Sequence, residues 1–187
     1  MEHKTSGILA PQGIFMPQEL MQELQHKQKN LYIGIPCETS FQENRIALVP
    51  ESVAVLVSNG HQVVVETNAG KNANFTDTDF SEAGARIGYS PTEVFEADLI
   101  LKVAPPSSNE LELLRDRQTL ISILQITMQN KEYIQAISRK KITAMAYEFI
   151  KDETDLMPVI QAMSETEGRT SILLTAQHSR NTTGGTG

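Results

Sequence analysis

Residues 31–66, LYIGIPCETSFQENRIALVPESVAVLVSNGHQVVVE, hold the pattern that decides the fold. An apolar run at 31–35 and a valine-rich run at 61–66 each have the length of a strand. Between them, Pro50 and Gly60 carry the signals that open and close a helix. The apolar positions of this helix are Val53, Val55, Leu56 and Val57. A strand, a helix and a second strand in this order are typical of a parallel βαβ unit.

The same alternation continues as far as residue 146. Further strands are predicted at 85–87, 98–103, 119–124 and 142–146, and helices at 78–83, 108–115, 131–140 and from a capping box at Ser90-Pro91-Thr92-Glu93. In the helix at 131–140 the apolar positions are Tyr133, Ile134 and Ile137. In the last strand, alternation of Ile142, Ala144 and Ala146 with Thr143 and Met145 suits a strand between two layers. We therefore predict an α/β fold with a doubly wound, mostly parallel sheet, flavodoxin-like or Rossmann-like, with right-handed crossovers.

Two segments flank this region. Residues 1–30 are polar and are interpreted as an appended extension with one amphipathic helix at 17–27. A long helical pattern starts at Pro158 and runs to about Gln177, before a loop-like end that is rich in glycine and threonine.

The bulk properties restrict the partners. A formal charge of −7 and a pI near 5.1 argue against nucleic acid and against an anionic membrane, because both attract basic surfaces. A lone cysteine, Cys37, cannot form an internal disulfide, and no apolar run reaches the length of a membrane span. We expect a cytoplasmic protein whose partner is a small molecule or another protein.

Polar residues that follow the predicted strands mark the candidate site, because ligands of parallel sheets bind beyond the carboxyl ends of the strands. These residues are Glu43, Asn44, Arg45, Lys102, Gln125, Tyr147 and Glu148. A guanidinium and an ammonium that converge there would bind the carboxylate of an oxo or amino acid. Lys102 is the more informative of the pair, because it interrupts an apolar strand.

Each candidate also has a structural alternative. Arg45 could be a solvated loop residue, and Lys102 could extend its ammonium to water. Gln125 and Glu148 are weaker candidates, and Cys37 is expected to be unreactive. The four histidines, His3, His26, His61 and His178, are expected at surface or structural positions.

Six motifs in order resemble the alanine dehydrogenases and the nicotinamide nucleotide transhydrogenase α subunit. They are Ile33-Gly34-Ile35-Pro36-x-Glu38 with 43–50 (ENRIALVP), Gly60-His61, 82–85 (EAGA), 99–106 (LILKVAPP), 143–148 (TAMAYE) and 163–169 (MSETEGR). Together they cover residues 31 to about 187, and alanine dehydrogenase is the nearer of the two.

The resemblance implies an NAD-dependent reaction, the reversible oxidative deamination of L-alanine to pyruvate and ammonia. It implies that Arg45 and Lys102 hold the carboxylate and carbonyl of the substrate, with Lys102 also catalytic, and that Ser164 touches the cofactor. The alternative for Ser164 is a helix cap, because Ser164-Glu165-Thr166-Glu167 fits a capping box. The family forms homo-oligomers, and the expected domains are an extension at 1–30, a substrate-binding α/β domain at 31–155, and at 156–187 a linking helix with the start of an NAD-binding domain.

Three features depart from the family pattern. Gln125 stands where the family has its catalytic histidine, and a glutamine cannot exchange a proton at neutral pH. A G-x-G-x-x-G fingerprint is missing, so the chain is expected to end before its cofactor domain and to be inactive alone. Glu167 replaces a small residue, a charge expected to disturb helix packing. The transhydrogenase α subunit, part of a membrane complex, needs no such histidine and stays an alternative, as does a noncatalytic ligand-binding module of the same fold.

Overall fold

The computed structural model describes residues 30–179, and the residues from Leu31 onward belong to one compact unit. The helix predicted at 17–27, the rest of the extension before residue 30 and the glycine-rich end after residue 179 lie outside the described residues.

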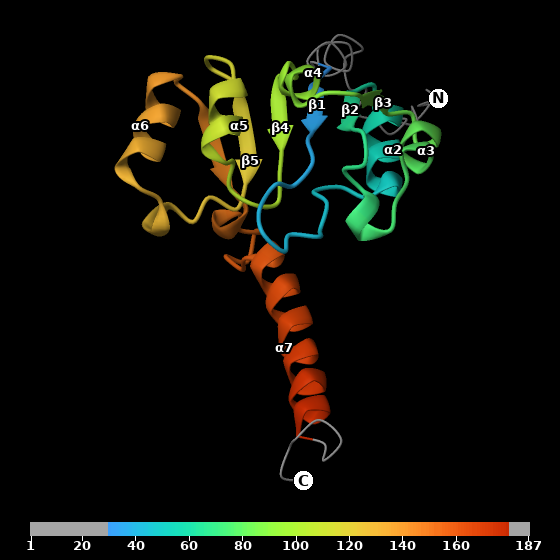
Figure 1. Ribbon diagram of the computed structural model, residues 1–187, viewed down its shortest axis with the longest axis vertical. Helices are drawn as coiled ribbons and strands as arrows, with labels where there is room; N and C mark the ends of the chain where they lie inside the picture. Colours follow the sequence, from blue (N-terminus) through green and yellow to red (C-terminus); the bar gives the residue numbers. More distant parts are fainter. Residues whose placement is uncertain (1–29, 180–187) are drawn as a thin grey trace, which may run out of the picture. The chain divides into compact units, whose positions relative to one another are not determined.

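A six-stranded sheet forms the centre of the unit (Figure 1), and its strand order is β3-β2-β1-β4-β5-β6. The strands are β1 (Tyr32–Ile35), β2 (Gln62–Glu66), β3 (Arg86–Gly88), β4 (Leu99–Leu101), β5 (Thr119–Ser122) and β6 (Thr143–Ala146). All five neighbouring pairs are parallel, which confirms the doubly wound α/β prediction. The chain winds outward from β1 to one edge and then from β4 to the other, in the order of dinucleotide-binding sheets.

Helices alternate with the strands as the sequence predicts. They are α2 (Pro50–Ser58), α3 (Asp77–Glu82), α4 (Pro91–Phe95), α5 (Ser108–Leu113), α6 (Lys131–Arg139) and α7 (Pro158–His178), with 3₁₀ turns η1 (Lys71–Ala73), η2 (Ile126–Met128) and η3 (Tyr147–Phe149). Ser90 caps α4 by accepting the backbone N–H of Glu93. The predicted capping box is only half formed, because the Glu93 carboxylate accepts the N–H of Tyr89 instead.

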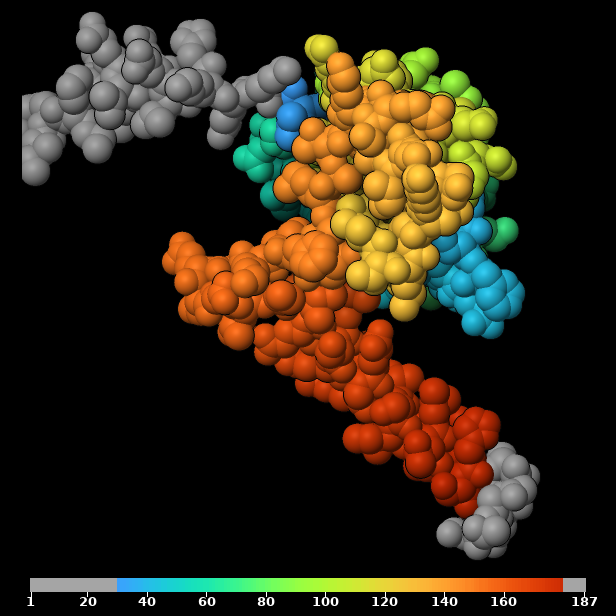
Figure 2. Space-filling view, turned by 90° about the vertical axis from the view of Figure 1, so that its left-hand side faces the viewer, coloured from blue at the N-terminus to red at the C-terminus, as the bar shows by residue number. Residues whose placement is uncertain are grey.

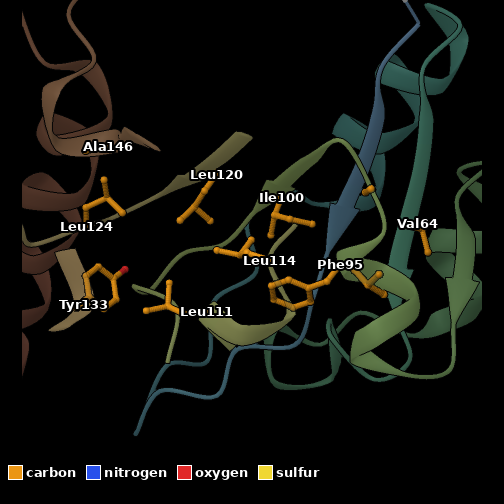
Figure 3. Packing of buried hydrophobic residues seen from close by; sticks show 11 residues of the cluster. Val64, Phe95, Ile100, Leu111, Leu114, Leu120, Leu124, Tyr133 and Ala146 are labelled. Carbon is orange, nitrogen blue, oxygen red and sulfur yellow. The ribbon is translucent and has the colours of Figure 1, made fainter. Parts of the chain in front are cut away.

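Alternate residues of β1, β2, β4 and β5 enter two separate cores. Ile33 and Ile35 face α2 and α3, where they pack with Val53 and Phe80. The opposite face packs against α4, α5 and α6 (Figure 3), and its members include Val64, Phe95, Ile100, Leu111, Leu114, Leu120, Leu124, Tyr133 and Ala146. Gly34 lies under α4 on this face, where an added Cβ would lie 2.4 Å from the carbonyl oxygen of Val94.

Three predicted apolar positions do not face a core. Val55 is 59% exposed, because it lies two residues from the buried Val53 and therefore points to the other side of α2. Ile134, one residue after the buried Tyr133, is 41% exposed for the same reason. Met145 is 46% exposed, so within the described residues β6 is covered on one face only, whereas the alternation predicted a strand between two layers.

The last helix, α7, starts at Pro158 and ends at His178, close to the predicted bounds. None of its described residues is buried, and Ile172, Leu173 and Leu174 are all exposed. Figure 1 shows it leaving the edge at which the strands end, and Figure 2 shows it extending away from the sheet region. Among the described residues, no helix combines the length and apolar character that crossing a membrane requires.

Candidate substrate site at the carboxyl ends of the strands

The topological switch of the sheet lies between β1 and β4, from which the chain winds in opposite directions. In open parallel sheets the crevice beyond this point is the usual place for a ligand. Two segments border it here: the loop 36–49, which follows β1 and carries Arg45, and residues 102–107, which follow β4.

Glu38 joins these two segments. Its carboxylate accepts the backbone N–H of Val103 at 2.6 Å and that of Ala104 at 3.2 Å. Its side chain is only 5% exposed, so these contacts are made away from solvent. Glu38 therefore fixes the loop after β1 to the main chain after β4.

Lys102 is buried, with 1% of its surface exposed. The alternative in which its ammonium extends to water is therefore wrong. It follows the last residue of β4 rather than interrupting the strand, although its N–H still binds the carbonyl oxygen of Ile121. Its Nζ lies 2.9 Å from Oε1 of Glu110 and 3.2 Å from Oε2 of Glu38. It also donates to the carbonyl oxygen of Cys37 at 3.3 Å, so three acceptors surround an ammonium that has three protons.

Glu110 is the second partner of Lys102 and is also buried. Its carboxylate accepts the hydroxyl of Thr39 at 3.1 Å and caps α5 through the N–H and hydroxyl of Ser107. Burial alone would raise the pKa of this carboxyl, but the charge and hydrogen bond of Lys102 and the hydrogen bonds of Ser107 outweigh it. The pKa of Glu110 is therefore lowered from its ordinary value of 4.5.

Arg45 is the exposed cation of the site, with 53% of its side chain accessible. Its guanidinium binds both carboxylate oxygens of Glu43, with Nε donating at 2.8 Å and Nη2 at 2.6 Å. This hydrogen bonding lowers the pKa of Glu43 and raises that of Arg45, to which the charges of Glu167 and Glu38 also contribute. Arg45 thus already shows the planar grip on a carboxylate that a substrate would use.

A small hollow of about 80 Å³ adjoins this guanidinium. It is lined by Cys37, Glu38, Glu43, Arg45, Asn68, Ala69 and Asn72. Lys102 is absent from the lining, and Glu38 is the neighbour that the two cations share. The structure places both predicted cations at the same end of the sheet, with Arg45 open to solvent and Lys102 enclosed behind Glu38.

Gln125 follows β5 and is exposed. Its backbone is left-handed, with φ 46° and ψ 47°, and its N–H donates to Oε1 of Glu148 at 2.9 Å. The same carboxylate oxygen accepts the N–H of Leu124 at 3.0 Å. Glu148 therefore holds the turn that presents Gln125.

Tyr147 precedes Glu148 in the chain. Burial raises the pKa of Tyr147 to about 12, and the negative charge of Glu38 adds to this effect.

Ser164 lies within α7 and is exposed. The predicted capping box at this serine is wrong, because α7 begins six residues earlier, at Pro158. Glu167, expected to disturb packing, is an exposed residue of the same helix and has no buried neighbour on it to disturb.

The sequence reasoning did not assign a role to Glu38 or Glu66 and counted Glu148 only as a weaker candidate, although these carboxylates organise this edge. Glu38 and Glu148 each bind two consecutive N–H groups after a neighbouring strand, and Glu66 accepts the N–H of Cys37 at 2.9 Å. All three lie at the last residue of a strand or within three residues of its end. The glutamates at or just after the ends of β1, β2 and β6 are a signal that was available in the sequence.

The described residues at the switch do not fit a nicotinamide dinucleotide. Such sites hold the pyrophosphate on the backbone of a glycine-rich turn at a helix N-terminus. The loop 36–49 contains no glycine and brings Glu38 and Glu43, two negative charges, to that place. Within residues 30–179, moreover, no group of three His, Cys, Asp or Glu side chains could hold a metal ion.

Comparisons with known proteins place this chain among proteins of known families. The family model described as "Alanine dehydrogenase/PNT, N-terminal domain" matches residues 34–167. Alanine dehydrogenase 2 of Staphylococcus aureus (strain USA300) is 36% identical over 155 residues, which cover 83% of this chain and 41% of that protein. The alanine dehydrogenase of Staphylococcus epidermidis (strain ATCC 12228 / FDA PCI 1200) is also 36% identical, and 42% of it is covered. The chain thus spans less than half the length of these curated relatives.

Two solved structures are similar in fold and in sequence. An L-alanine dehydrogenase superposes with a TM-score of 0.79 at 34% identity, covering 83% of this chain and 43% of that one. A transhydrogenase from Sinorhizobium meliloti superposes with a TM-score of 0.60 at 35% identity, covering 65% of this chain and 35% of that one. Since the family match extends over most of the compact unit, the chain belongs to the alanine dehydrogenase/PNT N-terminal domain family.

Proposed function

We propose that this chain is the substrate-binding part of an NAD-dependent alanine dehydrogenase. Residues 31–155 form the substrate domain in this proposal, and 156–187 form the link to a nucleotide-binding domain. The family membership and the names of the relatives support the reaction. A cytoplasmic location and a homo-oligomeric assembly belong to the same proposal.

The observation that carries the proposal is the grip of Arg45 on a carboxylate. Its guanidinium binds both oxygens of Glu43, and about half of the side-chain surface of Arg45 is still exposed. A small organic acid that enters the adjoining hollow replaces Glu43 in this bidentate pair. Pyruvate and L-alanine both carry the carboxylate that such a pair requires.

The reaction converts L-alanine, NAD⁺ and water into pyruvate, ammonium, NADH and a proton. When bound, NAD would supply the hydride acceptor, and Ser164 is the residue that we propose would contact it. Gln125 can orient the substrate by hydrogen bonds, but the proton must pass to water or to another group, because an amide does not titrate at neutral pH. We propose that Lys102, whose ammonium pairs with Glu110 and Glu38, holds the substrate together with Arg45 and takes part in catalysis.

The transhydrogenase α subunit is the second candidate, and Gln125 is the observation that favours it. Passing a hydride between two nicotinamides needs no proton donor at this position, so a glutamine suffices there. A transhydrogenase from Sinorhizobium meliloti is one of the similar structures. In this case a membrane complex, rather than pyruvate or alanine, is the partner.

The test is oxidation of NADH by the complete protein that contains this chain. Pyruvate-dependent oxidation that also requires ammonium supports the dehydrogenase, whereas hydride transfer from NADPH to an NAD analogue without pyruvate supports the transhydrogenase. Absence of both activities supports a noncatalytic binding module. If the dehydrogenase is correct, Arg45→Ala raises the KM for pyruvate by about 30-fold or more, the effect of about 2 kcal/mol from a lost charge-assisted pair. Arg139→Ala, at an exposed arginine on α6, is the matched control.

A further inference from the structure

We infer that Glu110 is a positioning residue, which fixes the ammonium of Lys102 in the orientation that Lys102 needs to hold the substrate beside Arg45. The inference rests on the proposed function, in which Lys102 and Arg45 bind the substrate together. It adds to that function a residue on α5, a helix that carries none of the groups proposed to touch substrate or cofactor.

The first step is the set of contacts that Lys102 makes. Its Nζ donates one hydrogen bond to Oε1 of Glu110 at 2.9 Å and another to the carbonyl oxygen of Cys37 at 3.3 Å. Its contact with Glu38 is an ion pair at 3.2 Å. An ammonium has three protons, so one N–H is not committed to a hydrogen bond and can be donated to an oxygen of the substrate.

The second step is the way in which Glu110 itself is held. Its Oε2 accepts the backbone N–H of Ser107 at 2.7 Å, the hydroxyl of Ser107 at 2.8 Å and the hydroxyl of Thr39 at 3.1 Å. These donors come from the start of α5 and from the loop after β1, and the side chain of Glu110 is only 8% exposed. One carboxylate oxygen is therefore anchored to two segments of the chain, while the other binds Lys102.

The third step is the charge of Glu110. Burial opposes its ionisation, but the charge and hydrogen bond of Lys102 and the hydrogen bonds of Ser107 outweigh burial and lower its pKa. Glu110 is therefore a carboxylate at neutral pH, and its bond to the ammonium is charge-assisted. A lysine carries its charge on a flexible four-carbon stem, so the place of that charge is decided by such a partner.

Glu38, the other carboxylate beside Nζ, is less suited to this task. Its distance from Nζ is the longer of the two, and its oxygens already accept the N–H groups of Val103 and Ala104. Glu38 thus holds the main chain after β4, whereas Glu110 holds the ammonium.

The test compares two variants of the complete protein that both weaken the start of α5. Glu110→Gln removes the charge that faces Lys102, whereas Ser107→Ala removes the capping hydroxyl and keeps the backbone N–H that binds Oε2 of Glu110. We expect both variants to lower the unfolding midpoint. Only Glu110→Gln should lower kcat/KM for pyruvate by about tenfold or more, because a small misplacement of a binding group is costly.

Ser107→Ala should keep kcat/KM within about threefold of the wild type, since the carboxylate stays in place. A loss in Glu110→Gln no greater than the loss in Ser107→Ala would overturn the inference, because Glu110 would then act only through the stability of α5.

A second readout does not depend on turnover. Crystal structures of the wild type and of Glu110→Gln should show Nζ of Lys102 displaced by more than about 0.5 Å, the tolerance of a productive site. An unmoved Nζ would overturn the inference even where the wild type is active. A wild type without pyruvate-dependent activity would refute the proposed function, and the position of Nζ would still decide whether Glu110 fixes the ammonium. If Glu110→Gln does not fold, Glu110→Asp, which keeps the charge but withdraws it by one methylene, takes its place with the same expected displacement and a loss of kcat/KM.

Discussion

Glu148 accepts the backbone N–H of Gln125 at 2.9 Å, although 23 positions separate the two residues in the chain. Its carboxylate also accepts the N–H of Leu124, and Gln125 itself is left-handed. We predict that Glu148→Ala accelerates amide exchange at both positions, because Glu148 is the acceptor of both N–H groups in a turn that is costly for a residue with a Cβ. Glu148→Gln, which keeps one acceptor oxygen, should give intermediate rates. Equal protection in all three proteins would show that Glu148 does not hold the turn.

Gln125→His tests whether this position lies within reach of the reacting groups. The side chain is exposed, and histidine is one of the residues that tolerate left-handed backbone, so the fold should be kept. We expect kcat/KM for pyruvate in the complete protein to gain a pH dependence with a midpoint near 6.5, the ordinary pKa of histidine. Gln125→Asn, which cannot titrate, is the control. A pH profile identical to that of the wild type would place residue 125 outside the reaction centre.

The lowered pKa of Glu110 predicts a loss of stability in acid. A carboxyl whose folded pKa lies below its unfolded value stabilises the protein above the unfolded value, here 4.5, and that contribution is lost as the pH falls through the folded pKa. The urea midpoint of the wild type should therefore fall more between pH 6 and pH 3 than that of Glu110→Gln. At pH 7, Glu110→Ala should lower the free energy of unfolding by about 1–3 kcal/mol, because it removes the acceptor that Lys102 and Ser107 share in a buried site. Parallel pH curves for wild type and Glu110→Gln would contradict the assignment.

Cys37 should react slowly with thiol reagents while the protein is folded. Burial raises the pKa of its thiol to about 12, and the negative charge and hydrogen bonding of Glu66 add to this effect. Since the thiolate is the reactive form, alkylation at pH 8 should be slower than for a free cysteine by at least tenfold and should recover in urea. Cys37 is the only cysteine of the chain, so total labelling reports on it directly. Glu66→Gln should increase the folded rate, and an unchanged rate would remove Glu66 as a cause.

The alternation of strands and helices was predictable because it rests on local signals. Proline at the first turn of α2, α4 and α7 and the hydroxyl cap at Ser90 set the helix starts within the chain itself. It was harder to predict which side of each short helix faces the core. Val55 and Ile134 lie one or two residues from buried residues, and they differ from them only in their angle around the helix axis. The sequence also predicted the α/β class without specifying that all six strands are parallel or that β1 lies beside β4.

The sequence predicted where the candidate site lies but not which residues contact each other there. Arg45 and Lys102 follow β1 and β4, which meet at the switch, so their shared edge follows from the topology. Their opposite degrees of exposure depend on Glu38 and Glu110, which come from a loop and from α5 and enclose only Lys102. Such long-range ion pairs leave no periodic trace in a single sequence. Their nearest signal is the recurrence of glutamate near the strand ends.

Apart from the ion pair of Glu38 with Lys102, the contacts of Glu38 and Glu148 are made to the main chain, at Val103, Ala104, Leu124 and Gln125. A peptide N–H is the same in every residue except proline, so the identity of the side chain at these four positions is not read by the carboxylates. Because only main-chain N–H groups are bound, the side chain at such a position can change while the strands and turns stay the same. An example is the replacement of a histidine by a glutamine at residue 125. Proline is the one replacement that would remove these N–H donors.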